Sequence, residues 1–282
     1  MNSLMTTERL SNNLEKVRIF DASWHLPNIN RNAFKEFNQC HIKNSTFFDI
    51  DANSNQNSPL PHMLTTKKEW EKILSEFGIN NSDHVVIYDY SDVISSCRIW
   101  YNFLYFGHDS NLISILDGGL KKWLHEKRST YKEIKIFEYS KYNATENSSL
   151  VLNKNQINSN IKDKIFELVD ARSRERFLGK QPEFRKELKS GNIEGSKNLP
   201  FTELINKSDK TFKKKNELTD IFVDIDTIVN YHILYGLIYM SYYYEYMPFN
   251  FLNFKMWYGL FACLYVFLLS TLNIGATIYS PC

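Results

Sequence analysis

The chain of 282 residues is long enough for about two domains, each with its own hydrophobic core. Its 34 Lys and Arg residues nearly balance 32 Asp and Glu residues, so the net charge favours no nucleic-acid partner and no anionic lipid. The four cysteines form no C-x-x-C pair, which argues against a disulfide framework and against a metal site. The N-terminal segment lacks the apolar run of a secretory signal, so we expect a cytoplasmic location.

Short apolar or β-branched runs alternate with amphipathic segments through the first half of the chain. The runs predict strands at residues 17–21, 45–51, 85–89 and 112–116. The amphipathic segments predict helices at 33–38, 66–77 and 98–106, and a further helix around Trp123 after a Gly-Gly turn. This alternation is typical of an α/β domain with a largely parallel sheet flanked by helices.

The start of the helix predicted at 98–106 carries polar and reactive side chains. We expect Ser95 and Ser96 to cap this helix. No glycine lies near Cys97 to turn backbone amides toward its thiol, so we interpret it as a buried helical cysteine. We expect Arg98 to pair with a buried acid such as Asp89 and to have a structural role.

The second half of the chain repeats the first. The segment 17–23, followed by 41–45, returns as 166–172 followed by 192–196. A repeat at this large offset indicates a duplicated domain rather than a solenoid, whose period is ~20–50 residues. We therefore divide the chain into a first domain (1–128), a linker with the start of the second domain (129–160), the N-terminal half of that domain (161–226) and an aberrant apolar tail (227–282).

Motifs in the two halves occur in one order and together resemble one family. The first half contains Asp21-Ala22-Ser23-Trp24, Phe47-Phe48-Asp49-Ile50-Asp51, Pro61-His62-Met63-Leu64 and Leu116-Asp117-Gly118-Gly119. The second half contains Asp170-Ala171-Arg172-Ser173, Arg176-Phe177-Leu178-Gly179, Pro182-Glu183-Phe184-Arg185 and Asn198-Leu199-Pro200-Phe201. Residues 17–226 thereby resemble the two-domain rhodanese family of thiosulfate and 3-mercaptopyruvate sulfurtransferases. The resemblance implies tandem rhodanese-like α/β domains, the second of them incomplete in this chain.

This resemblance implies the movement of a sulfane sulfur from 3-mercaptopyruvate or thiosulfate to a thiol or cyanide acceptor, through a cysteine persulfide and without a cofactor. It assigns Arg176 and Arg185 to binding of the anionic donor, which a guanidinium suits. The alternative is two solvated arginines on a charged loop. It also assigns Asp51 and His62 to proton transfer. The alternative for this second pair is a hydrogen bond at a domain interface.

The nucleophile of the family is missing from its expected place. By resemblance, a cysteine in a glycine-rich loop should follow shortly after Asp226, because convergent backbone amides stabilise its thiolate. Residues 228–235 contain neither cysteine nor glycine. The resemblance therefore implies that this chain is inactive or impaired as a sulfurtransferase.

The tail after Asp226 is almost uncharged, with only Glu245 and Lys255 carrying charge between residues 227 and 282. Three interpretations remain open: a coding sequence read out of frame, a membrane anchor in place of the active-site half, or a divergent packed core. The stretch 256–278 approaches the ~20 residues of a membrane-spanning helix. The alternative function is therefore a non-enzymatic rhodanese-like module held at a membrane by this tail.

Overall fold

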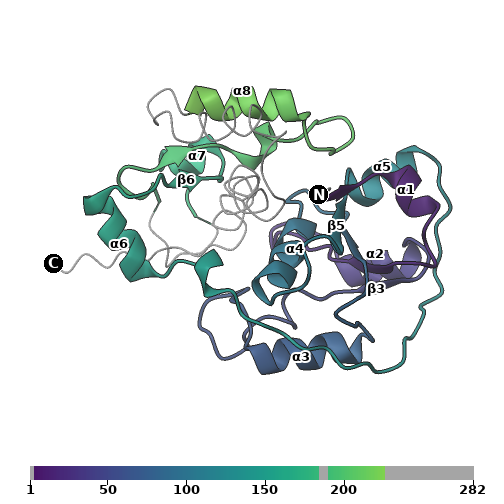
Figure 1. The fold of residues 1–282 in the computed structure, drawn as a ribbon. Coiled ribbons are helices and arrows are strands. Elements are labelled where there is room, and N and C mark those ends of the chain that lie inside the picture. Colours follow the sequence, from purple (N-terminus) through teal and green to yellow (C-terminus); the bar gives the residue numbers. More distant parts are fainter. Residues whose placement is uncertain (1–2, 184–189, 226–282) are drawn as a thin grey trace, which may run out of the picture. The chain divides into compact units, whose positions relative to one another are not determined.

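The computed structural model describes residues 3–183 and 190–225. These residues belong to two compact units, which are drawn in Figure 1. The first unit comprises the chain up to Leu152 together with Lys207–Phe212, and the described part of the second comprises residues 153–183, 190–206 and 213–225. Both units combine parallel strands with helices, which confirms the predicted α/β class with largely parallel sheets.

A five-stranded parallel sheet forms the centre of the first unit. Its strands are β1 (Leu4–Met5), β2 (Arg18–Asp21), β3 (Ser45–Phe47), β4 (Val85–Tyr88) and β5 (Ile113–Leu116), in the spatial order β1-β5-β4-β2-β3. All four residues of the central strand β4 are buried, as its continuous apolar run predicts. The strand predicted at 45–51 is shorter in the structure, and β1 is not predicted because two residues are too few for a periodic pattern.

Five helices accompany this sheet (Figure 1). They are α1 (Thr7–Ser11), α2 (Ala33–Gln39), α3 (Lys67–Glu76), α4 (Ser96–Tyr105) and α5 (Gly119–His125). Leu10 of α1 and Trp123 of α5 share a buried cluster with Ile19 of β2. The next residue of that strand, Phe20, contacts Phe103 of α4. Because successive side chains of a strand point to opposite faces, helices cover both sides of the sheet.

Aromatic rings join α3 to α4 in the core of the first unit. Trp70 of α3 stacks on Phe106, which follows α4, with 4.8 Å between the ring centroids. The same indole meets Phe103 edge-on at 5.3 Å. All three residues are fully buried. Rings of this size contribute on the order of 2 kcal/mol each through burial, so this cluster holds α3 and α4 together.

The segment predicted as a linker with the start of the second domain, 129–160, is divided between the two units. Its first part belongs to the first unit, where Tyr131 forms an isolated antiparallel bridge with His41. Further along, the Ser140 amide donates to the Ser75 carbonyl at 3.0 Å, and Tyr142 is buried. These contacts join residues distant in sequence. Because the segment has no helical or strand periodicity, its sequence pattern does not predict them.

The second unit repeats the order strand, helix, strand of the first. Its elements are α6 (Lys154–Asp163), β6 (Val169–Asp170), α7 (Arg174–Phe177), β7 (Lys197–Asn198) and α8 (Lys215–Ile225). Two short 3-10 helices complete the described chain, η1 (Ser148–Leu150) in the first unit and η2 (Phe201–Glu203) in the second. β6 and β7 pair in parallel, with Val169 opposite Lys197 and Asp170 opposite Asn198.

The predicted apolar tail, 227–282, and its stretch 256–278 lie outside the described residues. Within residues 3–183 and 190–225, no helix has both the length and the apolar character needed to cross a membrane.

Candidate functional site

The chain between β3 and α3 brings Asp51 and His62 into direct contact, and we call these two residues the Asp51–His62 pair. Nε2 of His62 lies 2.6 Å from Oδ1 of Asp51. The imidazole side chain is 7% exposed and the Asp51 side chain is 66% exposed, so a buried ring is hydrogen-bonded to a carboxylate at the surface. An imidazole beside a carboxylate can donate or accept a proton near neutral pH. The structure thus brings together two of the four predicted site residues.

Trp24 contacts both members of this pair. Its indole Nε1–H donates to Oδ2 of Asp51 at 3.0 Å. Its ring meets the His62 imidazole edge-on, with 4.9 Å between centroids. Trp24 is not among the predicted site residues, although it is the last residue of the Asp21-Ala22-Ser23-Trp24 motif. Its place in that motif was the available signal.

His62 also has an unusual backbone conformation, with a φ of +55°. Left-handed backbone is uncommon for residues other than glycine, and it persists where neighbouring groups hold it. Arg98 of α4 is such a neighbour, because its buried guanidinium donates to the His62 carbonyl oxygen. Burial lowers the pKa of Arg98 to about 9. The predicted pairing of Arg98 with Asp89 is therefore wrong, since the guanidinium is directed to a carbonyl instead.

The β4–α4 loop (residues 89–95) is closed by Asp89. One carboxylate oxygen accepts from the Ser91 amide and the other from the Ser96 amide, both at 2.9 Å. Asp89 is buried, and this burial raises the pKa of its carboxyl group. The carboxylate thus takes the capping role predicted for Ser95, whose side chain makes no cap hydrogen bond to α4. Ser95 instead accepts from the Trp24 amide at 3.1 Å and donates to the Ala22 carbonyl at 2.7 Å.

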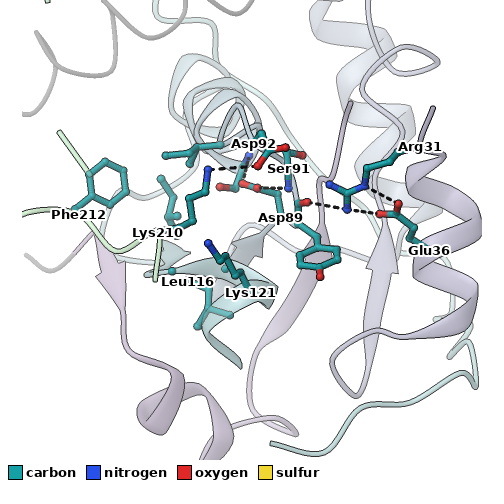
Figure 2. Close-up of a pocket in the computed structure, with 15 residues that line it drawn as sticks. Arg31, Glu36, Asp89, Ser91, Asp92, Leu116, Lys121, Lys210 and Phe212 are labelled. Atoms are coloured by element: carbon teal, nitrogen blue, oxygen red, sulfur yellow. Dashed lines mark hydrogen bonds and ion pairs between the residues drawn. The ribbon is translucent and has the colours of Figure 1, made fainter. Parts of the chain in front are cut away.

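A cavity of about 460 Å³ in the first unit adjoins this loop, at the carboxyl ends of β4 and β5. Figure 2 shows its charged side chains, most of which are engaged with one another. Arg31 donates to Glu36 at 2.8 and 2.7 Å, and Lys210 lies 3.4 Å from Asp92. Because Asp89 already accepts from the amides of Ser91 in the loop and of Ser96 at the start of α4, these amides are not available to an external anion.

In the second unit, a single buried carboxylate binds two arginines. Oε1 of Glu183 lies 2.6 Å from Arg172 Nη1, and Oε2 lies 2.5 Å from Arg176 Nη2. Arg172 also donates to Asp170 and to the Gly191 carbonyl. Burial alone would lower the pKa of Arg172, but the hydrogen bonds and charges of Asp170 and Glu183 more than offset it and raise that pKa.

The structure describes one of the two arginines that the sequence predicts to bind the donor. Arg176 lies in α7 and is 11% exposed, with its guanidinium fixed by Glu183. Arg185 lies outside the described residues. Glu183 is not among the predicted site residues, although it belongs to the Pro182-Glu183-Phe184-Arg185 motif. Its place in the sequence between Arg176 and Arg185 was the available signal.

Cys97 is buried within α4, as the sequence predicts. Cys263, Cys282 and the segment after Asp226 lie outside the described residues. Within the part of the chain that the structure describes, no three His, Cys, Asp or Glu side chains are grouped as metal ligands.

Comparison with known proteins identifies relatives across most of the described chain. Residues 6–126 match the rhodanese-like domain family. The chain is 38% identical over 193 residues to the 3-mercaptopyruvate sulfurtransferase of Mus musculus, an alignment that covers 68% of this chain and 64% of that protein. It is also 38% identical over 211 residues to the thiosulfate sulfurtransferase of Mus musculus, covering 74% and 70% of the two chains. The first of these alignments thus spans slightly less than two thirds of the relative's length.

Solved structures with the same fold include two close matches. The 3-mercaptopyruvate sulfotransferase SseA from Escherichia coli aligns with a TM-score of 0.73 and 28% identity, covering 82% of this chain and 86% of that chain. Tum1 from Saccharomyces cerevisiae aligns with a TM-score of 0.72 and 26% identity, covering 80% and 79%.

Proposed function

Because the chain belongs to the rhodanese family of thiosulfate and 3-mercaptopyruvate sulfurtransferases, we propose that it binds a small anionic sulfur donor and supplies the proton-transfer part of a sulfurtransferase site. The observation that carries this proposal is the 2.6 Å contact between His62 and Asp51. Both residues lie in motifs that resemble the family, and their side chains meet although eleven positions separate them.

Sulfur transfer from 3-mercaptopyruvate includes a proton transfer, which is the role we propose for the Asp51–His62 pair. A thiolate attacks the donor sulfur, so that an S–S bond forms and the C–S bond breaks with its electron pair left on carbon. That carbon then takes a proton and becomes the methyl group of pyruvate. An acceptor thiol or cyanide afterwards removes the outer sulfur and releases the thiolate. We assign delivery of the proton to His62, with Asp51 as the carboxylate that keeps the imidazole oriented.

Donor binding is assigned to Arg176, together with Arg185. A guanidinium has five N–H donors in a rigid fork, a geometry that suits the carboxylate of 3-mercaptopyruvate or the charged oxygens of thiosulfate. Glu183 fixes the guanidinium of Arg176 at 2.5 Å. Support for Arg185 comes from its place in the Pro182-Glu183-Phe184-Arg185 motif alone.

The nucleophile is the part that this chain does not encode at the expected place. The sequence contains no cysteine between Cys97 and Cys263. Cys97 is buried within α4 and does not fit the role of an accessible thiolate. We therefore propose that the chain binds the donor without forming a persulfide at a rate typical of the family.

The test uses the full chain with 3-mercaptopyruvate or thiosulfate and cyanide, and measures thiocyanate; the mouse 3-mercaptopyruvate sulfurtransferase serves as the positive control. We expect no thiocyanate above the protein-free rate and no sulfur added to the intact mass. In parallel, titration calorimetry should detect thiosulfate binding, weakened at least about tenfold by Arg176→Gln. Turnover comparable to that of the control would refute the proposal that this chain lacks a working nucleophile. Equal thiosulfate binding by the variant and the parent would refute the role of Arg176.

A further inference from the structure

We propose that Trp24 is a positioning residue, which holds the Asp51 carboxylate in the orientation that receives the His62 imidazole. This inference rests on the proposed function, because it gives the Asp51–His62 pair a means of remaining aligned. The indole N–H and the imidazole bind different oxygens of the same carboxylate, Oδ2 at 3.0 Å and Oδ1 at 2.6 Å. Rotation of that carboxylate would break both contacts.

The need for such a residue follows from the exposure of Asp51. Its side chain is 66% exposed and belongs to the segment between β3 and α3, which has no helix or strand of its own around this position. An exposed carboxylate exchanges between rotamers and water contacts unless a neighbour orients it. The Trp24 indole provides one donor in a fixed direction, because its ring is rigid and is also packed edge-on against His62.

Trp24 is in turn fixed by the β4–α4 loop. Its backbone amide donates to the hydroxyl of Ser91 at 2.8 Å and to that of Ser95 at 3.1 Å. The two hydroxyls are 2.7 Å apart, and Ser95 also donates to the Ala22 carbonyl. This network explains why Ser95 does not cap α4, because its hydroxyl is used to fix Trp24.

The same part of the fold fixes the other member of the pair. Arg98 of α4 donates to the His62 carbonyl oxygen and holds that residue in its left-handed conformation. The β4–α4 loop and α4 therefore orient both Asp51 and His62, the first through Trp24 and the second through Arg98.

If Trp24 had only a packing role, its aromatic ring would be needed and its indole N–H would not. A positioning role requires the N–H as a hydrogen-bond donor. Trp24→Phe separates the two, because phenylalanine keeps an aromatic ring and removes the donor. Trp123→Phe is the matched control, since Trp123 Nε1 also donates at 3.0 Å, to the Ser129 carbonyl, elsewhere in the same unit.

The experiment follows the exchange of the His62 Nε2 proton with water by NMR, in the full chain labelled in its histidine ring nitrogens. The signal is assigned by its loss in His62→Gln. Asp51→Asn is the positive control, because it removes the carboxylate itself. We expect Trp24→Phe to accelerate this exchange at least about tenfold, and Trp123→Phe to change it by less than about twofold.

Exchange in Trp24→Phe within about twofold of the parent, with Asp51→Asn accelerated, would overturn the proposal. If Trp24→Phe loses its folded amide spectrum, Ser91→Ala decides instead, since it keeps the indole and removes one hydroxyl that fixes Trp24. Exchange faster than the parent supports the positioning role, and unchanged exchange contradicts it. The readout needs neither donor nor turnover, so failure of donor binding and failure of positioning are distinguishable.

Discussion

Glu183 and Arg176 form a buried ion pair in the second unit, with 2.5 Å between Oε2 and Nη2. The carboxylate is 1% exposed, and its other oxygen binds Arg172. Two guanidinium groups that would repel each other are therefore held by one shared anion. This arrangement fixes the direction of the Arg176 guanidinium.

The first prediction concerns this shared carboxylate. Glu183→Gln leaves two guanidinium groups beside a neutral amide, and we expect it to reduce the stability of the second unit by about 3 kcal/mol. Amide hydrogen exchange of β6 and β7, followed by mass spectrometry, measures the loss. Glu203→Gln is the matched control, because the Glu203–Arg174 pair is largely exposed and should contribute less than about 0.5 kcal/mol. Equal effects of the two substitutions would contradict the role of Glu183.

The second prediction concerns pH. Burial raises the pKa of Asp21 from an ordinary 3.8 to about 7, against hydrogen bonds from Ser23 that lower it. The folded state therefore retains a proton that the unfolded chain loses, and the contribution of Asp21 to the free energy of unfolding should fall as pH rises from about 4 to about 7. We expect Asp21→Asn, which imitates the protonated carboxyl group, to remove this dependence. Its magnitude is on the order of 4 kcal/mol at most.

Urea denaturation of the parent and of Asp21→Asn at several pH values, followed by tryptophan fluorescence, checks this expectation. The difference in unfolding free energy between the two proteins should grow in favour of the variant as pH rises. Parallel pH profiles would show that Asp21 is not the group responsible.

The third prediction concerns the turn after β5. Gly119 has a φ of +55°, and a Cβ at this position would overlap the carbonyl oxygen of Asp89. We expect Gly119→Ala to cost about 3 kcal/mol, through the left-handed backbone and through displacement of the β4–α4 loop. Gly195 has a φ of +78° with no atom near its Cβ position, so Gly195→Ala should cost only about 1 kcal/mol in the second unit. Thermal unfolding of each variant measures the two costs.

The fourth prediction concerns the start of α3. Thr66 accepts from the Glu69 amide, and the Glu69 side chain accepts from the Thr66 amide, which makes a reciprocal cap. Thr66→Ala should destabilise the first unit by about 1 kcal/mol, since it leaves a helix amide without an acceptor. Thr66→Ser retains the hydroxyl and should change stability by less than about 0.5 kcal/mol. Chemical denaturation compares them, and equal losses in both would show that the hydroxyl is not the cause.

The architecture could be predicted from local sequence patterns to a large extent. The β-branched run 85–89 predicts the buried strand β4, and the spacing of Trp70, Leu74 and Phe77 predicts α3. These elements form because their periodicity is contained within a few residues. The segment 129–152 shows the limit of such patterns, because its contacts with the rest of the first unit join residues about 60 to 90 positions apart.

At the candidate site, too, the sequence predicts some features and only the folded chain determines others. Residue type and motif order identify Asp51, His62 and Arg176 as candidates, since each carries its chemistry wherever it lies. The partners of these residues depend on the folded chain. Trp24 receives its support from Ser95, 71 positions away, and Arg98 binds the carbonyl of His62, 36 positions away. Hydrogen bonds are directional and act over about 3 Å, so no periodicity in the sequence reveals which hydroxyl, guanidinium or carboxylate will meet which partner.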